Sequence, residues 1–113
     1  MYPSFDKVIT IVYTPHIKVR MTHEFASWLR RLRDKRASDR IVKRIRRIEL
    51  GNLGDTKPVG GGVHEFRIDY GQGYRVYFAN AQSEIVILLV GGNKSTQNRD
   101  IREAKRLLSE YTD

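Results

Sequence analysis

The sequence predicts an α+β protein in which a mainly antiparallel, twisted sheet packs against a helical hairpin and a C-terminal helix. Two kinds of apolar spacing support this prediction. Residues 22–50 and 101–111 place apolar side chains three and four positions apart, as helices do, whereas residues 63–79 place them at every second position, as strands do. A chain of 113 residues is too short for two independent cores, so we expect one domain over residues 1–113.

The first half of the chain predicts one strand followed by two helices joined by a short polar turn. β-Branched and aromatic residues predict the strand at residues 8–13. Thr22 is a suitable N-cap for the first helix, Asp34 or Ser38 can begin the second, and Gly51 ends it. The apolar positions are Phe25, Trp28, Leu29 and Leu32 in the first helix and Ala37, Ile41, Ile45 and Ile48 in the second.

The second half predicts three strands and a final helix, which gives the element order β-α-α-β-β-β-α. Residues 52–62 are rich in glycine and proline and predict a loop. The strands at 63–70 and 74–79 should form a hairpin around the glycine-containing turn 71–73. The third strand, 85–90, is continuously apolar and should be buried on both faces.

The alternation within this hairpin predicts which side chains share a face. A three-residue turn places Arg67 opposite Tyr77 and Asp69 opposite Arg75. The polar face then consists of Glu65, Arg67, Asp69, Arg75 and Tyr77. His64 falls on the other face, with the apolar residues, and should be packed in the core or at its edge.

The final helix should begin directly after the apolar strand. Ser95 or Thr96 can cap it. Its predicted core face is Ile101, Ala104, Leu108 and Tyr111. Lys94, Ser95 and Thr96 would then lie at a helix N-terminus, where backbone N–H groups favour an anion; the alternative is an ordinary capped helix with an exposed lysine.

The positive charge of the chain is concentrated in one segment. The formal net charge is +8, and residues 20–50 alone carry eleven lysines and arginines against four acidic residues. Such a segment is either a solvated helical face or a binding surface for a polyanion such as nucleic acid. The candidate residues for binding RNA or the ribosome are Arg40, Lys43, Arg44 and Arg47 in this segment and Lys57 after it.

Composition also excludes several classes of protein. The chain has no cysteine, which excludes disulfides and thiolate chemistry, and its three histidines lack the spacing of metal ligands. We therefore expect neither a metal nor a cofactor. The longest apolar run is too short to span a bilayer and the N-terminus lacks a basic-then-apolar leader, so we expect a soluble cytoplasmic protein without membrane contact.

Three residues of the hairpin are candidates for chemistry. Arg67 and Arg75, on adjacent strands and one face, can clamp a phosphate, although each can equally form a cross-strand pair. Glu65 on the same face can act as a general base, and its place between arginines suits either a weak base or a structural salt bridge.

Several motifs occur in the order found in a known toxin superfamily. They are Glu65-Phe-Arg-Ile68, Tyr70-Gly-Gln-Gly-Tyr-Arg-Val-Tyr-Phe78, Gly91-Gly-Asn-Lys-Ser-Thr-Gln97 and Asp100-Ile101. Over residues 8–111 the chain resembles the RelE/ParE toxins, and more closely the branch called addiction module killer proteins, which is related to HigB toxins. The resemblance implies the compact sheet-and-helix fold of that superfamily.

The resemblance also implies a function. RelE-like toxins cut mRNA in the ribosomal A site without a metal, by attack of the ribose 2′-OH on the adjacent phosphate. The chain would be the toxin of a type II toxin–antitoxin pair, with a helix-turn-helix antitoxin through which it oligomerises and with the ribosome and mRNA as further partners. ParE-like members instead poison DNA gyrase without ribonuclease chemistry. A non-toxic nucleic-acid-binding module is the third alternative.

The resemblance implies roles for four residues. Arg75 occupies the position of a catalytic arginine in the Gly-Tyr-Arg block, Arg67 matches a strand lysine, and Lys94 lies near the place of a second arginine. Glu65 stands where RelE has its other strand lysine, so it is a candidate base. Asp100-Ile101 falls where RelE has a tyrosine.

Overall fold

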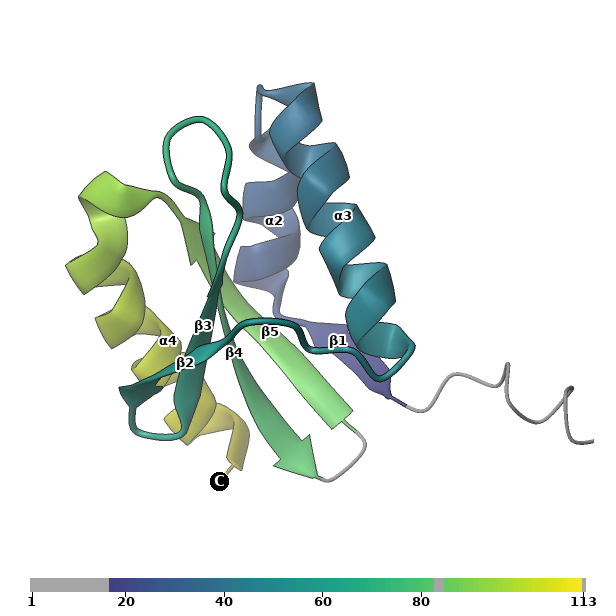
Figure 1. The fold of residues 1–113 in the computed structure, drawn as a ribbon. Coiled ribbons are helices and arrows are strands. Elements are labelled where there is room, and N and C mark those ends of the chain that lie inside the picture. Colours follow the sequence, from purple (N-terminus) through teal and green to yellow (C-terminus); the bar gives the residue numbers. More distant parts are fainter. Residues whose placement is uncertain (1–16, 83–84, 113) are drawn as a thin grey trace, which may run out of the picture.

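The computed structural model describes residues 17–82 and 85–112 and has an α+β architecture (Figure 1). In chain order the elements are β1 (Lys18–Met21), α2 (His23–Arg31), α3 (Lys35–Glu49), β2 (Lys57–Gly60), β3 (Val63–Arg67), β4 (Arg75–Gln82), β5 (Ile85–Gly92), the short 3₁₀ helix η1 (Lys94–Thr96) and α4 (Gln97–Thr112). The strands form one sheet in the order β1-β5-β4-β3-β2. The β1–β5 pair is parallel and the other three pairs are antiparallel.

The α+β prediction is confirmed, but the sheet has five strands where the sequence predicted four. The predicted strand at 8–13 lies outside the described residues. Two observed strands were not predicted: β1, and β2, which lies within the predicted loop 52–62. Both are four-residue strands at the edges of the sheet, and β2 pairs irregularly with β3. Strands this short and exposed carry too little alternation to be recognised from the sequence.

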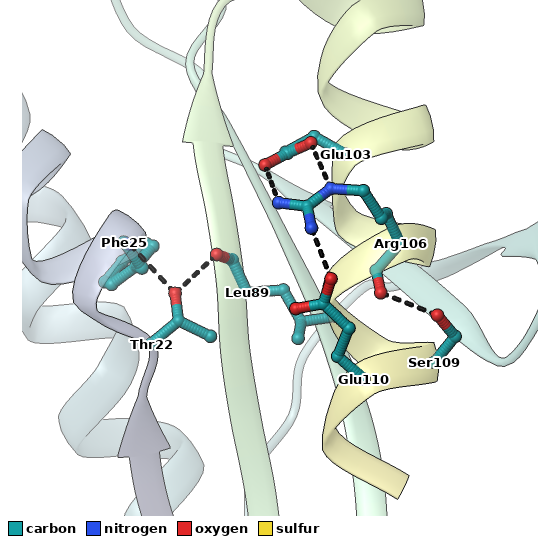
Figure 2. Close-up of polar contacts among 7 residues, drawn as sticks. All are labelled: Thr22, Phe25, Leu89, Glu103, Arg106, Ser109 and Glu110. Carbon is teal, nitrogen blue, oxygen red and sulfur yellow. Dashed lines mark hydrogen bonds and ion pairs between the residues drawn. The ribbon is translucent and has the colours of Figure 1, made fainter. Parts of the chain in front are cut away.

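The two predicted helices of the hairpin are confirmed, together with their caps. The Thr22 hydroxyl accepts a hydrogen bond from the Phe25 N–H and donates one to the Leu89 carbonyl, so it ties the start of α2 to β5 (Figure 2). The Asp34 carboxylate caps α3 by accepting from two backbone N–H groups. Gly51 follows the C-cap of α3 with a φ of 94°, a conformation that glycine adopts without strain.

The sheet separates two apolar clusters. On one face, α2 and α3 pack against alternate residues of β3, β4 and β5; the predicted stripe Ala37, Ile41, Ile45 and Ile48 is buried there. On the other face, α4 packs through Ala104 and Leu107. Figure 1 shows α4 and the α2–α3 pair on opposite sides of the sheet. The continuously apolar run is buried from Val86 to Val90, as predicted for a central strand.

The β3–β4 hairpin has the predicted faces but not the predicted register. Arg67 lies opposite Arg75, and Glu65 lies opposite Tyr77, so the pairing is shifted by two residues from the prediction. Because a shift of two preserves the alternation, the same side chains share a face. The loop is longer than three residues because β3 ends at Arg67 and Asp69 lies beyond the strand. His64 lies at the edge of the core, stacked on Phe78.

The final helix, α4, begins at Gln97, directly after the predicted cap residue Thr96, and a short 3₁₀ turn that was not predicted precedes it. Asn93 is the N-cap of this turn, η1, and its side chain accepts from the Ser95 N–H. The 3₁₀ turn then leads directly into α4. Tyr111 was predicted to face the core but is 47% exposed, and Leu107 is buried in the α4 cluster. Within residues 17–82 and 85–112, no helix has the length and apolar character needed to cross a bilayer.

Gly91 on β5 allows the Trp28 ring of α2 to lie directly on the sheet. A Cβ atom at this position would lie 2.2 Å from the ring. We expect Gly91→Ala to lower the free energy of unfolding by about 1–3 kcal/mol, because the methyl group overpacks this contact. Urea unfolding followed by circular dichroism measures the change. The loss should shrink in a Trp28→Leu background, and equal losses in both backgrounds would contradict the steric explanation.

Candidate functional site

A buried carboxylate joins two strands and a helix at the centre of the predicted site. Glu65 on β3 is 1% exposed. Its Oε2 accepts a hydrogen bond from Arg67 Nε at 2.8 Å and lies 3.6 Å from Arg75 Nε on β4, and its Oε1 accepts from Gln97 Nε2 on α4 at 3.2 Å. We call Glu65, Arg67, Arg75 and Gln97 the Glu65 cluster.

The two arginines of the Glu65 cluster differ in their access to solvent. The Arg75 side chain is 6% exposed, and its Nη1 donates to the Gly73 carbonyl at 2.8 Å. The Arg67 side chain is 54% exposed. The hydrogen bond and the charge of Glu65 raise the pKa of the Arg67 guanidinium. Arg75 is therefore held inside the fold and Arg67 is exposed to solvent, and both guanidinium groups form an ion pair with Glu65.

Lys94 lies beside this cluster, across the β3–β4 turn. Its backbone N–H donates to the Gln72 carbonyl at 3.4 Å, which docks η1 on the turn. A Cβ at Gly73 would lie 3.3 Å from Arg75 Nη1 and 3.7 Å from Lys94 Cβ, so the absent side chain leaves space for both residues. The structure thus brings together the four predicted catalytic residues, three by direct contact and Lys94 through Gly73.

Tyr77 and Gln97 belong to this region, although neither was predicted as a site residue. Tyr77 is fully buried, and its hydroxyl has no hydrogen-bond partner within the described residues. Burial, followed by the charge of Glu65, raises the pKa of Tyr77 to about 12. Strand alternation places Tyr77 on this face, whereas no sequence signal connects Gln97 with a strand more than thirty residues earlier.

The predicted RNA-binding residues line two adjoining open clefts, which we call the basic cleft. One, of about 510 Å³, extends from the loop after α3 to Glu65 and Arg67. The other, of about 570 Å³, runs along α3. The predicted residues that line them are Arg40, Lys43, Arg44, Arg47 and Lys57. Asp69, which was not predicted as a site residue, lines both clefts, is exposed, and makes no ion pair within the described residues.

Arg44 differs from the other residues of the basic cleft because its guanidinium serves the fold. Its Nη2 donates to the backbone carbonyls of Leu53 at 3.1 Å and Asp55 at 2.8 Å. The group also lies over the Phe66 ring, 4.6 Å from its centroid. Burial and the charge of Arg47 lower the pKa of Arg44. Arg44 therefore fastens the loop after α3 to the sheet and shapes the wall of the cleft.

We expect Arg44→Ala to lower the free energy of unfolding by about 1–3 kcal/mol, because the loop carbonyls lose their donor and Phe66 loses the cation. Arg44→Lys should be nearly as destabilising, because one ammonium group cannot replace the planar fork. Urea unfolding measures both. Arg47→Ala, which removes an exposed neighbour, is the control and should change stability by less than about 0.5 kcal/mol. An effect of Arg44→Ala no larger than this control would contradict the structural role.

Comparisons with known proteins identify the family of the chain. Residues 27–110 match the family described as Phage derived protein Gp49-like (DUF891). The chain is also 51% identical over 94 residues to an uncharacterized protein of Haemophilus influenzae, covering 83% of this chain and 95% of that protein. The matched family is a RelE/ParE-like toxin family of toxin–antitoxin systems, and membership implies a cognate antitoxin as partner. The chain therefore belongs to the Gp49-like family of toxins.

Proposed function

We propose that this toxin is a metal-independent mRNA interferase of the HigB-like branch, which cuts messages on the translating ribosome and thereby stops growth. The observation that carries the proposal is the pair of guanidinium groups, Arg67 and Arg75, organised by one buried carboxylate next to an open basic cleft. Paired guanidinium groups of fixed orientation suit the non-bridging oxygens of a phosphodiester.

In the proposed reaction the ribose 2′-OH loses its proton and its oxygen attacks the adjacent phosphorus. The bond from phosphorus to the 5′-oxygen breaks, which leaves a 2′,3′-cyclic phosphate and a 5′-oxygen that takes a proton from water. Negative charge accumulates on the phosphate oxygens in the transition state. Arg67 contacts this phosphate from the cleft, Arg75 stabilises the same charge from inside the fold, and Lys94 adds a third positive charge. Because Arg75 is already fixed by Glu65 and Gly73, little reorganisation is needed when the charge develops.

The burial of Glu65 favours a positioning role over the role of general base. Its carboxylate is 1% exposed, and both of its oxygens accept hydrogen bonds from the protein. A base must reach the 2′-OH, and Glu65 is not accessible to it. Asp69 is the exposed carboxylate next to Arg67 in the basic cleft, so we assign the removal of the 2′-OH proton to Asp69.

The basic cleft provides the binding surface for RNA. Arg40, Lys43, Arg47 and Lys57 are exposed along it, and binding through such residues should weaken steeply as the salt concentration rises. Arg44 supports this surface from within. A helix-turn-helix antitoxin that covers or competes for these residues would keep the toxin inactive and mediate its oligomerisation.

Cell-free translation followed by primer extension tests the proposed reaction. We expect the purified protein to cut the message only when ribosomes are translating it. Arg75→Ala and the more exposed Arg67→Ala should each abolish the cuts, whereas Arg30→Ala, on α2 outside the basic cleft, should not. Thermal unfolding shows whether each variant is folded. An uncut message with normal translation would overturn the proposal, and gyrase-dependent DNA breaks in that case would favour the ParE-like alternative.

The two carboxylates should be distinguishable by the size of the loss of cleavage. Asp69→Asn should slow cleavage by about 10²–10⁴-fold, because a general base is lost. Glu65→Gln should slow cleavage by less than Asp69→Asn does, since it loosens Arg75 but removes no base. Asp55→Asn, at another exposed carboxylate of the cleft, is the matched control. The opposite pattern would return the role of base to Glu65.

A further inference from the structure

A third cleft lies between α2 and α4, on the opposite side of β5 from the Glu65 cluster. Pairing of β1 with β5 ends at Met21 and Leu88, whereas β5 continues to Gly92. Beyond Leu88 this edge of β5 therefore has no strand beside it within the described residues. The cleft along this edge has a volume of about 470 Å³, and we call it the edge groove.

The lining of the edge groove combines an apolar floor with arginines on two walls. Trp28, Val90 and Gly91 supply the apolar part, and the Trp28 ring lies against Gly91. Arg31 extends from α2, and Arg99, Arg102 and Arg106 extend from α4. The aromatic floor is not involved in the Glu65 cluster or the basic cleft.

The acidic residues of the groove are already occupied by partners. Glu103 accepts two hydrogen bonds from Arg106, which also binds Glu110 (Figure 2). Asp100 accepts from the Thr96 hydroxyl and lies 3.6 Å from Arg99. These acidic residues therefore pair with Arg99 and Arg106 of the same helix.

Arg31 and Arg102, by contrast, have no ion pair within the described part of the chain, and both are exposed. They face the groove from opposite walls, because one belongs to α2 and the other to α4. Two unpaired guanidinium groups across an apolar floor attract a segment that carries carboxylates on its sides and an apolar side chain in its centre.

We propose that the edge groove binds an acidic segment of the antitoxin, with an apolar side chain of that segment packed on Trp28. A peptide fits these features better than RNA does. The apolar floor of Trp28, Val90 and Gly91 suits an aliphatic side chain, which a peptide supplies. A mixture of arginine and acidic side chains also favours carboxylates spaced along a peptide over an unbroken row of phosphates. The proposal depends on the toxin–antitoxin role of the family and not on nuclease activity.

Trp28 is the only tryptophan of the chain, so its fluorescence reports directly on occupation of the groove. The probe is a short synthetic peptide of alternating glutamate and leucine, titrated into the purified full-length protein. We expect a saturable shift of the tryptophan emission. The double variant Arg31→Glu/Arg102→Glu should weaken binding by at least about tenfold, because both walls then repel the peptide.

Matched controls separate the groove from general attraction between a basic protein and an acidic peptide. Arg30→Glu/Arg46→Glu makes the same change of charge at two exposed arginines outside the groove, and it should leave the affinity within about twofold. A peptide of alternating glutamate and serine should bind more weakly, because it lacks the apolar side chain. Circular dichroism shows whether both double variants are folded.

The remaining outcomes would overturn the proposal. Equal weakening by both double variants would show attraction by net charge alone. A shift caused by oligouridine and not by the peptide would make the groove a nucleic-acid site. Absence of any saturable shift would show that the groove binds neither ligand. Because no readout involves cleavage, failure of the proposed nuclease reaction would leave these results interpretable.

Discussion

The ionised carboxylate of Glu65, buried on a strand, constrains both the hairpin and the site around it. Removing a carboxylate from water costs several kcal/mol unless opposite charges and hydrogen bonds compensate. The compensation comes from Arg67 on the same strand, Arg75 on the next strand and Gln97 on α4. A slip of one residue in β3 would place Glu65 among the apolar residues under α3. The register of the sheet, the docking of α4 and the orientation of the arginines are therefore fixed together.

This arrangement explains how a strongly basic chain can hold a buried arginine at its site. Arg75 is accommodated by Glu65 and the Gly73 carbonyl, but its Nε and the nearby Tyr77 hydroxyl are buried without a hydrogen-bond partner among the described residues. Such incomplete satisfaction is unfavourable for stability, yet it keeps donors oriented where charge develops in a reaction. Arg44 differs from Arg75 because its contacts with the loop carbonyls and with Phe66 stabilise the fold.

Most of the architecture could be predicted because apolar spacing is a local property. The apolar stripe of α3 could be predicted from the helical period alone, and the buried strand β5 from the length of its apolar run. The hairpin register was predicted wrongly because its loop depends on distant contacts: the Tyr70 hydroxyl donates to Asp34 at the start of α3, and Gln72 contacts Asn93. The same limit applies to the site. Alternation predicted that Glu65, Arg67 and Arg75 share a face, whereas Gln97 joins them only when α4 docks.

The two carboxylates near Arg67, Glu65 and Asp69, lie in environments that suit different roles in the proposed reaction. Glu65 is 1% exposed, and each of its carboxylate oxygens accepts a hydrogen bond from the protein. Asp69 is exposed in the basic cleft and has no ion pair within the described residues. Where two carboxylates share a site, burial and partners decide which one organises charge and which one exchanges protons. The hairpin produces this division by ending β3 at Arg67, which leaves Glu65 inside the sheet and releases Asp69 into the cleft.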